Sequence, residues 1–505
     1  MNTIAFQPAL RPALLPVFGS VDYQSQRLLF ERIDAILTES KLDALFLKLA
    51  LQDQELDAAA ATPARLASFH QMTFVGLRAN LARSLLGLAH REFCARLADS
   101  PLLQWFLHVG QVDQVKVFAK STSHRFEQWV SEASMRSINQ QLIALSIIPP
   151  AADGSLPFNL KEPIAIDDAF FDTTCIKPTM HFPTDWVLLG DAVRTLMKGT
   201  ICIRHAGLKV RMPQAPETFI SDMNKLGMAM AAQRRSAQSK TNRKAILRKM
   251  KRLAPRVQSH AQAHRDALTT RRTESALSEG QARVILQRLE NILAQLPAAI
   301  KQAHERIIGE RPVANEDKIL SLYDADIEVI VRGKAGSEVE FGNKLSLVEN
   351  NQGLIIDYQL HRDNPSDSKL VEPSIKRMIK ELKLPIQTLW SDRGMSSKSN
   401  EKILEHYGIK SGLCPRNPEE LRERMQDPTY RAGMKRRGNT EARIAIFKNV
   451  ILGNPVRQKS IGARERASGW AVLSHNLWVL GRMQQATAKA AKPAPPPAPS
   501  QAAAA

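Results

Sequence analysis

Apolar residues at helical spacing dominate the first 150 positions. They recur every three or four residues through 28–37, and again from Leu81 towards Gly110, which predicts an all-helical N-terminal domain over residues 1–150. After Gly110, three hydroxyl residues at 121–123 stand at an expected cap position before a short helix. This pattern, a helix followed by a short break and a capped helix with Lys120 and Arg125, is typical of a helix-turn-helix and predicts a possible DNA-binding domain. An ordinary helical bundle is the alternative.

The pattern changes near Pro149, where a loop rich in turn residues precedes a β-type segment at 165–176. Helical spacing returns over 185–315, with an apolar stripe that Pro297 is expected to interrupt. Further strands are expected at 319–331, 338–350, 353–363 and 386–392, and further helices at 366–384 and from there to about 483. This order predicts an α/β domain over 156–485, a mixed sheet with helices on both faces and a large helical insertion at about 190–315. The Ala- and Pro-rich residues 486–505 are expected to be disordered.

Composition adds that the chain is long and apolar enough to build a core. It has 505 residues, 44% of them hydrophobic, and a net charge of +20, which indicates a polyanionic partner. Two runs supply +18 of this charge. The run 234–256 has ten basic residues and no acid, and the run 431–466 has ten basic residues and two acids. Residues 1–150 are almost neutral, with 14 basic and 13 acidic side chains. The charge therefore belongs to the second half of the chain.

The cysteine spacing and the hydropathy of the chain indicate the cellular compartment in which the protein is expected. The four cysteines show no CxxC spacing, so we expect buried thiols in a reducing compartment and neither a zinc knuckle nor a disulfide framework. We expect no signal peptide and no membrane segment, because the proline-containing start lacks a clean apolar core and no window reaches about 18 apolar residues. A cytoplasmic protein that meets a polyanion is therefore the expectation from these features.

Three acids stand where they could take part in chemistry. Asp172 follows an apolar pair in FFDTT, Asp392 follows the strand-like IQTLW and precedes a turn, and Glu441 is expected to start a helix inside the second basic run. Enzymes that cut or join nucleic acid commonly use two divalent cations held by carboxylates from different elements. A solvated surface acid is the simpler alternative for each, and four further aspartates compete for the same roles: Asp167, Asp168, Asp324 and Asp326.

Several blocks of sequence together resemble the DDE transposases of bacterial insertion sequences. They are FFDTTCIKPTMHFPTDWVLLGDAVRTL, RGKAGSEVEFGNKLSLVENNQGLIIDYQLHRDNPSDSKL, SDRGMSSKSNEKILEHYGIK, RRGNTEARIAIFKNVILGNPVRQKSIG and WAVLSHNLWVLGRM, in order over residues 165–483. The resemblance implies an RNase H-like catalytic fold that uses Mg²⁺, with Mn²⁺ as a substitute. It also implies DNA cleavage at terminal inverted repeats followed by strand transfer into target DNA.

The same resemblance assigns residues to roles. Asp172, Asp392 and Glu441 become the catalytic acids and the ligands of two metal ions. Arg437 and Lys448 match basic positions four before and seven after the glutamate, whereas Met434 stands where many relatives have a tyrosine. Two copies are expected to act as a dimer in a synaptic complex, because two DNA ends must be joined.

The remaining predictions concern double-stranded DNA. Contacts with it are expected from Arg437, Lys448, Arg393, Lys334, Arg243, Lys244, Arg248, Lys249, Lys251, Arg252, Lys120 and Arg125. The residues around Lys120 are expected to recognise the inverted repeats, and the others to neutralise phosphates without reading sequence. Two alternatives remain: an RNase H-like metal-dependent nuclease without strand transfer, and a catalytically inactive, domesticated DNA-binding protein.

Overall fold

The computed structural model describes residues 11, 13–110, 115–233, 237–334 and 337–490, without the side chains of 237, 332–338 and 484–490. It is an α/β structure with one mixed sheet. The chain divides into two compact units, one made of residues 1–176 and 344–505 and the other of Lys177–Asn343. Among the described residues, no helix has the length and apolar character needed to cross a membrane.

Among the described residues before the first strand, the first unit is built of helices, apart from one isolated β-bridge between Gly110 and Val115. The helices are α1 (Val21–Glu39), α2 (Leu42–Asp53), α3 (Pro63–Leu85), α4 (His90–Asp99), α5 (Pro101–Leu107), α6 (Lys120–Glu127) and α7 (Glu132–Ser146), followed by the 3-10 turn η1 (Pro157–Asn159). Ser20, Thr62 and Ser131 cap α1, α3 and α7 by accepting a hydrogen bond from a first-turn amide, which satisfies a donor that the helix leaves unpaired.

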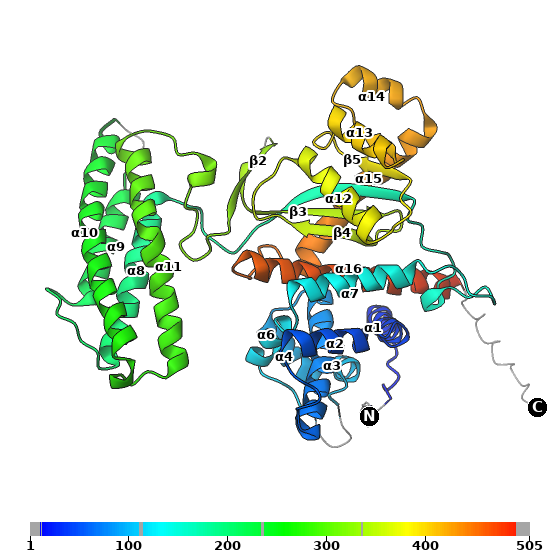
Figure 1. Ribbon diagram of the computed structural model, residues 1–505, viewed down its shortest axis with the longest axis horizontal. Helices are drawn as coiled ribbons and strands as arrows, with labels where there is room; N and C mark the ends of the chain where they lie inside the picture. The colour runs from blue at the N-terminus through cyan, green and yellow to red at the C-terminus, as the bar shows by residue number, and fades with distance from the viewer. Residues whose placement is uncertain (1–10, 12, 111–114, 234–236, 335–336, 491–505) are drawn as a thin grey trace, which may run out of the picture. The chain divides into compact units, whose positions relative to one another are not determined.

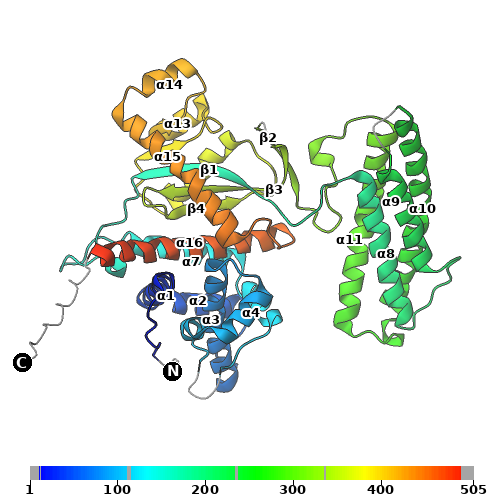
Figure 2. The same cartoon turned by 180° about the vertical axis from the view of Figure 1, so that it is seen from behind.

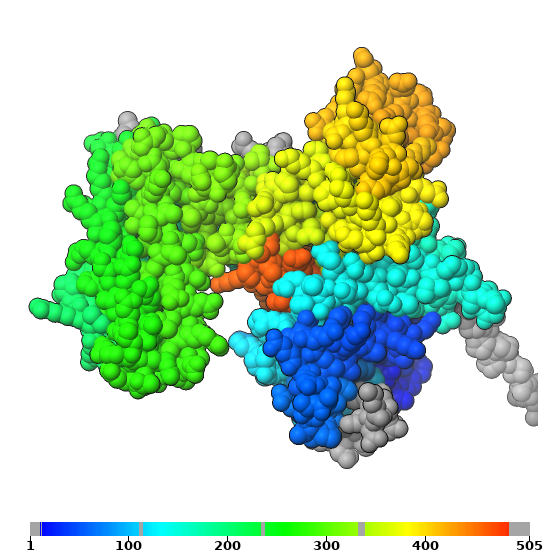
Figure 3. Space-filling model, viewed as in Figure 1, coloured from blue at the N-terminus to red at the C-terminus, as the bar shows by residue number. Residues whose placement is uncertain are grey.

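The C-terminal helix α16 (Ile461–Ala490) lies between these helices and the sheet (Figures 1 and 2). It packs against α1, α3 and α7 on one side and against β4 on the other. The Trp470 ring lies 5.6 Å from that of Phe46, and its indole N–H donates to the carbonyl of Glu127 at 3.1 Å. The N-terminal helices and the sheet therefore share one hydrophobic core, and the space-filling view shows them as contiguous layers (Figure 3).

The sheet contains β1 (Asp168–Ile176), β2 (Glu328–Lys334), β3 (Ser337–Asn350), β4 (Ile355–Leu360), β5 (Thr388–Ser391) and β6 (Lys410–Leu413). Its order is β2-β3-β1-β5-β6, and β4 pairs with β3. β1, β5 and β6 are parallel, whereas β2 and β4 run antiparallel to β3. The prediction of a mixed sheet is thus confirmed. Figures 1 and 2 show α12 (Val371–Lys376) over one face of the sheet and α15 (Pro428–Ile446) over the other.

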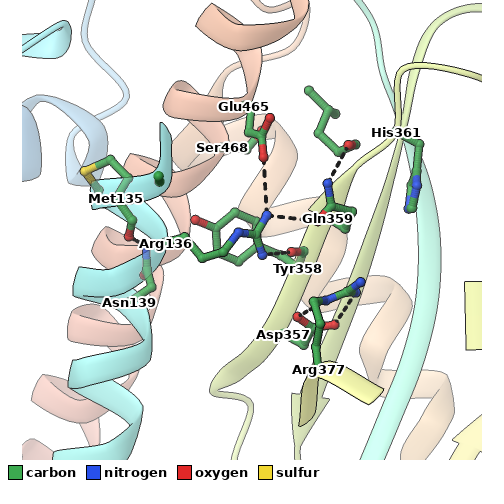
Figure 4. A network of polar contacts seen from close by, with 12 residues as sticks. Met135, Arg136, Asn139, Asp357, Tyr358, Gln359, His361, Arg377, Glu465 and Ser468 are labelled. Atoms are coloured by element: carbon green, nitrogen blue, oxygen red, sulfur yellow. Dashed lines mark hydrogen bonds and ion pairs between the residues drawn. The ribbon is translucent and has the colours of Figure 1, made fainter. Parts of the chain in front are cut away.

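Side chains cover the outer edge of β4. Asn476 of α16 accepts from the Ile355 amide at 2.8 Å and donates to the Ile355 carbonyl at 2.9 Å. Arg136 of α7 donates to the Tyr358 carbonyl at 2.7 Å and forms an ion pair with Glu465 of α16 (Figure 4). These bonds satisfy backbone groups that an exposed edge strand would offer to another chain.

The rest of the first unit surrounds the parallel strands. It consists of η5 (Asp367–Leu370), α12 (Val371–Lys376), η6 (Arg377–Glu381), α13 (Lys398–His406), α14 (Pro418–Arg424), α15 (Pro428–Ile446) and η7 (Phe447–Leu452). Trp390 of β5 packs so closely on α15 that a Cβ at Gly433 would lie 2.2 Å from its ring. A glycine is therefore required at this crossing.

The second unit is mainly helical, with a core of its own. Its elements are α8 (Asp185–His205), α9 (Pro216–Ala231), α10 (Ala237–Thr270), η2 (Arg272–Glu274), α11 (Glu279–Ala303), η3 (His304–Ile308) and η4 (Asn315–Asp317), and then β2 with the first part of β3. α8 packs against each of the other three long helices. A capping box at Ser278 and Gln281 begins α11.

Several boundaries differ from the sequence prediction. Residues 319–327 form turns and a loop rather than strand, and β6 was not predicted. α11 continues through Pro297, and α16 continues to Ala490, so the predicted tail begins inside a helix. Its residues 491–505 lie outside the described residues.

Candidate active site

The first two predicted acids lie on neighbouring segments at the point where the pairing of β1 with β5 ends. β1 and β5 are parallel and in register from Asp168 opposite Thr388 to Phe171 opposite Ser391, so Asp172 and Asp392 come next on neighbouring chains. Neighbouring strands are about 4.8 Å apart. Asp392 caps the turn after β5, because its Oδ1 accepts a hydrogen bond from the Gly394 amide at 3.0 Å.

Helix α15 brings the third acid to the same place. Arg437 Nη1 lies 3.9 Å from Asp172 Oδ2, and Arg437 Nη2 lies 3.9 Å from Glu441 Oε1, one helical turn further along. The side chains of Asp172 and Arg437 are 13% and 17% exposed, whereas that of Glu441 is 68% exposed. One guanidinium thus bridges two of the predicted acids.

Arg437 also has unused donors. Its Nε and Nη1 atoms are buried and find no hydrogen-bond acceptor in the described part of the chain. Buried donors without acceptors are uncommon and call for an explanation. An anionic ligand placed beside Asp172 would fill them.

The pKa of Asp172 reflects its burial and the charges around it. Burial raises the pKa of this carboxyl to about 6, and the charges of Asp392 and Glu441 act in the same direction. The amide hydrogen bond from Thr173, at 2.7 Å, and the charge of Arg437 oppose the shift. Like charges within a few ångströms disfavour one another's ionisation, so the two neighbouring acids add to the larger effect of burial on this pKa.

A fourth carboxylate, Asp367 at the start of η5, borders this site. Its Oδ1 accepts from Lys344 Nζ at 2.8 Å and from Thr173 Oγ1 at 3.3 Å. A Cβ at Gly394 would lie 3.1 Å from Asp367 Oδ2 and 3.2 Å from Asp392 Oδ1, so the two carboxylates flank the same glycine. Asp367 was not predicted from the sequence, where its only signal was its place in the run NPSDSKL of the resemblance.

The predicted basic residues near the acids, and one of the competing aspartates, differ in their exposure and their contacts. Lys448 Nζ donates to Thr174 Oγ1 on β1 at 3.2 Å, and Arg393 is exposed in the turn after β5. Lys334 ends β2, and its side chain lies outside the described residues. Of the competing acids, Asp168 accepts the Trp390 indole N–H at the far end of β1.

One local prediction about α15 needs correction. Glu441 does not start a helix, because α15 begins at Pro428 and Asp427 caps it; the run of small and charged residues before Glu441 hid the earlier start. Tyr430, one turn before the Met434 position, is buried and donates to the Leu413 carbonyl at 3.1 Å. It therefore packs α15 on the sheet and is not open to DNA.

The six basic residues predicted on the helical insertion all lie on α10. Arg248, Lys249 and Arg252 are exposed. The other three are partly buried and engaged within the second unit: Arg243 with the Gln233 carbonyl at 2.8 Å, Lys244 with Glu310 at 2.7 Å, and Lys251 with His304 at 2.9 Å. Half of the predicted set is thus presented to solvent.

Lys120 and Arg125 are both exposed on α6. Residues 121–123 lie within the first turn of α6 rather than before it, and the N-terminal position is taken by Ala119 without a side-chain hydrogen bond. The connection from α5 to α6 spans residues 108–119, longer than the three- or four-residue turn of a helix-turn-helix.

Carboxylates alone supply the candidate ligands. Oxygen donors of this kind suit Mg²⁺, which keeps several waters and needs few protein ligands. No group of three or more His, Cys, Asp or Glu residues in the described ranges is close enough to hold a metal ion as it stands. The arrangement here is a close pair of aspartates with Glu441 drawn towards Arg437.

Comparison with known proteins found no matching family model, no matching curated protein and no matching solved structure.

Proposed function

We propose that this protein is a transposase that binds the terminal inverted repeats of an insertion sequence and catalyses Mg²⁺-dependent DNA cleavage and strand transfer. The observation that carries the proposal is the convergence of Asp172, Asp392 and Glu441 from β1, β5 and α15. The strand order β4-β3-β1-β5-β6, with β1, β5 and β6 parallel, supports an RNase H-like fold for the first unit.

The three carboxylates would hold the divalent cations. The raised pKa of Asp172 fits such a role, because acids crowded at one point are stabilised by a bound cation. Bound there, Mg²⁺ or Mn²⁺ would supply activation of the attacking oxygen and stabilisation of the leaving oxygen.

The basic side chains around the three acids would bind the phosphodiester of the DNA. Arg437 pairs with Asp172 and Glu441 at long range, and its unfilled donors point to a phosphate oxygen as their partner. Lys448 and Arg393 add positive charge beside β1 and β5. On α10, Arg248, Lys249 and Arg252 form a second basic surface that neutralises phosphates without reading sequence, and the inverted repeats are assigned to the α6 region.

The catalytic assignment is tested with labelled DNA ends and a plasmid target. The wild type should cut the ends in Mg²⁺ and join them to the plasmid, and Asp392→Asn should abolish both steps. Asp363→Asn, at an exposed aspartate, is the matched control. Cleavage without joined product would indicate a nuclease, and cleavage unchanged in Asp392→Asn would refute the triad.

The DNA surface of α10 is tested by replacing Arg248, Lys249 and Arg252 with glutamine. Binding to duplex DNA should weaken for every sequence alike. The slope of log K against log salt should become shallower by about 2 to 3, because each phosphate that is no longer neutralised removes about 0.9 from it. An unchanged slope would remove this surface from the proposal.

A further inference from the structure

We propose that Glu349, a buried glutamate on β3 outside the predicted triad, is a positioning residue that fixes α15 so that Arg437 and Glu441 face Asp172. The inference rests on the proposed function for its catalytic consequence. The positioning itself follows from the contacts that Glu349 makes.

Glu349 is 4% exposed and is surrounded by donors from one helix. It accepts hydrogen bonds from Arg436 Nη1 at 2.9 Å and from Thr440 Oγ1 at 2.8 Å. Arg443 Nη1 completes the group at 3.6 Å. A buried carboxylate needs such partners, and all three come from α15.

The two arginines extend the attachment beyond Glu349. Arg436 also donates to the carbonyls of Asn350 at 2.8 Å and Asn351 at 2.9 Å, and its guanidinium lies 4.4 Å from the Phe170 ring centre on β1. Arg443 occupies the space over Gly353, where a Cβ would lie 1.7 Å from Nη1. We call Glu349 with Arg436, Thr440 and Arg443 the α15 clamp.

Helical geometry connects the clamp to the active site. Positions 436, 440 and 443 lie on one face of α15, and each residue along a helix turns by about 100°. Arg437 and Glu441 each follow a clamp residue by one position, so they occupy the adjoining face, which looks towards Asp172. A rotation of α15 about its axis would therefore move both charges away from β1 together.

Apolar contacts hold α15 on either side of the clamp. The Trp390 ring of β5 packs on Gly433, and Tyr430 is buried in the same apolar cluster. Further along, Ile444 is partly buried against a second apolar cluster that contains Phe447 of η7. Between these apolar contacts, the clamp supplies the buried polar attachment of α15 to β3.

The matched control is the buried ion pair of Asp357 with Arg377. Asp357 lies on the neighbouring strand β4, is 5% exposed, and accepts from Arg377 at 2.6 and 3.0 Å, but its partners Arg377 and Ser374 belong to η6 and α12. Asp357→Asn therefore perturbs an equally buried carboxylate of the same sheet without touching α15.

The test measures helix position and turnover in the same variants. Spin labels are attached at Asn439→Cys on α15 and Lys410→Cys on β6, both exposed positions of the first unit, in a background with Cys94 and Cys202 replaced by serine. Glu349→Ala should broaden the inter-label distance distribution, and Glu349→Gln, which keeps an acceptor, should broaden it less. Asp357→Asn should leave it as in the wild type.

Turnover should follow the distances. We expect Glu349→Ala to lower kcat for end cleavage about 100-fold with KM for DNA unchanged, since small misplacements of catalytic groups have effects of this size, and Glu349→Gln to recover part of the loss. Unchanged distances in Glu349→Ala, or equal broadening in Asp357→Asn, would overturn the inference. If the wild type cuts no DNA, the proposed function fails, while the distances still decide whether Glu349 positions α15.

Discussion

Replacing Asp172 by asparagine is expected to stabilise the metal-free protein while it removes a carboxylate that the proposed reaction requires. Burial, with the charges of Asp392 and Glu441, raises the pKa of Asp172 from 3.8 to about 6. A shift of this size corresponds to about 3 kcal/mol by which ionisation of Asp172 disfavours the folded state. Asparagine carries no charge and keeps an oxygen for the Thr173 amide hydrogen bond.

The stability gained by Asp172→Asn should increase with pH. Because the pKa is higher in the folded than in the unfolded protein, the protonated carboxyl contributes stability at low pH that is lost as the pH rises from about 4 to about 6. Asp172→Asn should therefore match the wild type near pH 4. It should exceed the wild type by about 3 kcal/mol in free energy of unfolding near pH 8.

Urea unfolding followed by circular dichroism in EDTA, at about pH 4 and about pH 8, measures both values. The exposed Asp363→Asn variant should show no such pH-dependent gain. Adding Mg²⁺ near pH 8 should stabilise the wild type by about 2.7 kcal/mol at 100 times Kd and the variant by less. An Asp172→Asn variant that is no more stable than the wild type near pH 8 would refute the burial of the Asp172 carboxylate among like charges.

Three further outcomes are expected. Gly433→Ala should lower the free energy of unfolding by about 1 to 3 kcal/mol, because its Cβ would meet the Trp390 ring. Gly438→Ala on the same helix has open space around it and should raise the free energy of unfolding by about 0.5 to 1 kcal/mol. Thermal unfolding of the two variants measures both effects. Burial alone would raise the pKa of Glu127, but the hydrogen bond from His90 and nearby positive charges lower it to about 2. Glu127→Gln should thus lose about 3 kcal/mol near pH 7 in urea unfolding, and less as the pH falls from about 4.5 towards 2; an equal loss at about pH 3 would contradict this. Deleting α16 should leave the N-terminal helices without their apolar cover, so that hydrogen exchange finds them unprotected; native protection in the truncated chain would show that they fold alone.

Part of the fold could be read from local sequence. The β-branched and aromatic residues around Asp172 and the short apolar run before Asp392 predicted β1 and β5, and both acids were chosen within or directly after these segments. These signals are local because β-branched and aromatic residues favour strands wherever they cluster. The four-residue β6, KSGL, escaped prediction because, unlike TLWS of β5, it contains no β-branched or aromatic residue.

Other features depended on contacts between distant residues. Glu349 reads as one more acid in a strand, yet its partner Arg436 lies 87 positions away. In the sequence Arg436 is one more cation of the basic run 431–466, whereas in the folded chain it is bound to β3 and the turn after it. A charge count cannot distinguish a cation that faces solvent from one that a buried carboxylate holds, because that difference lies in tertiary packing.

The class of the fold, the aspartates on or after the predicted strands and the location of the positive charge follow from the sequence alone, since they depend on composition and on local residue patterns. The folded chain was needed to place Asp172 beside Asp392, through the parallel register of β1 and β5. It also drew Glu441 towards them through Arg437 and inserted α16 between the sheet and the N-terminal helices. Strand pairing and helix docking join segments far apart in the chain, and their free energy comes from burying both partners together, which neither segment encodes alone.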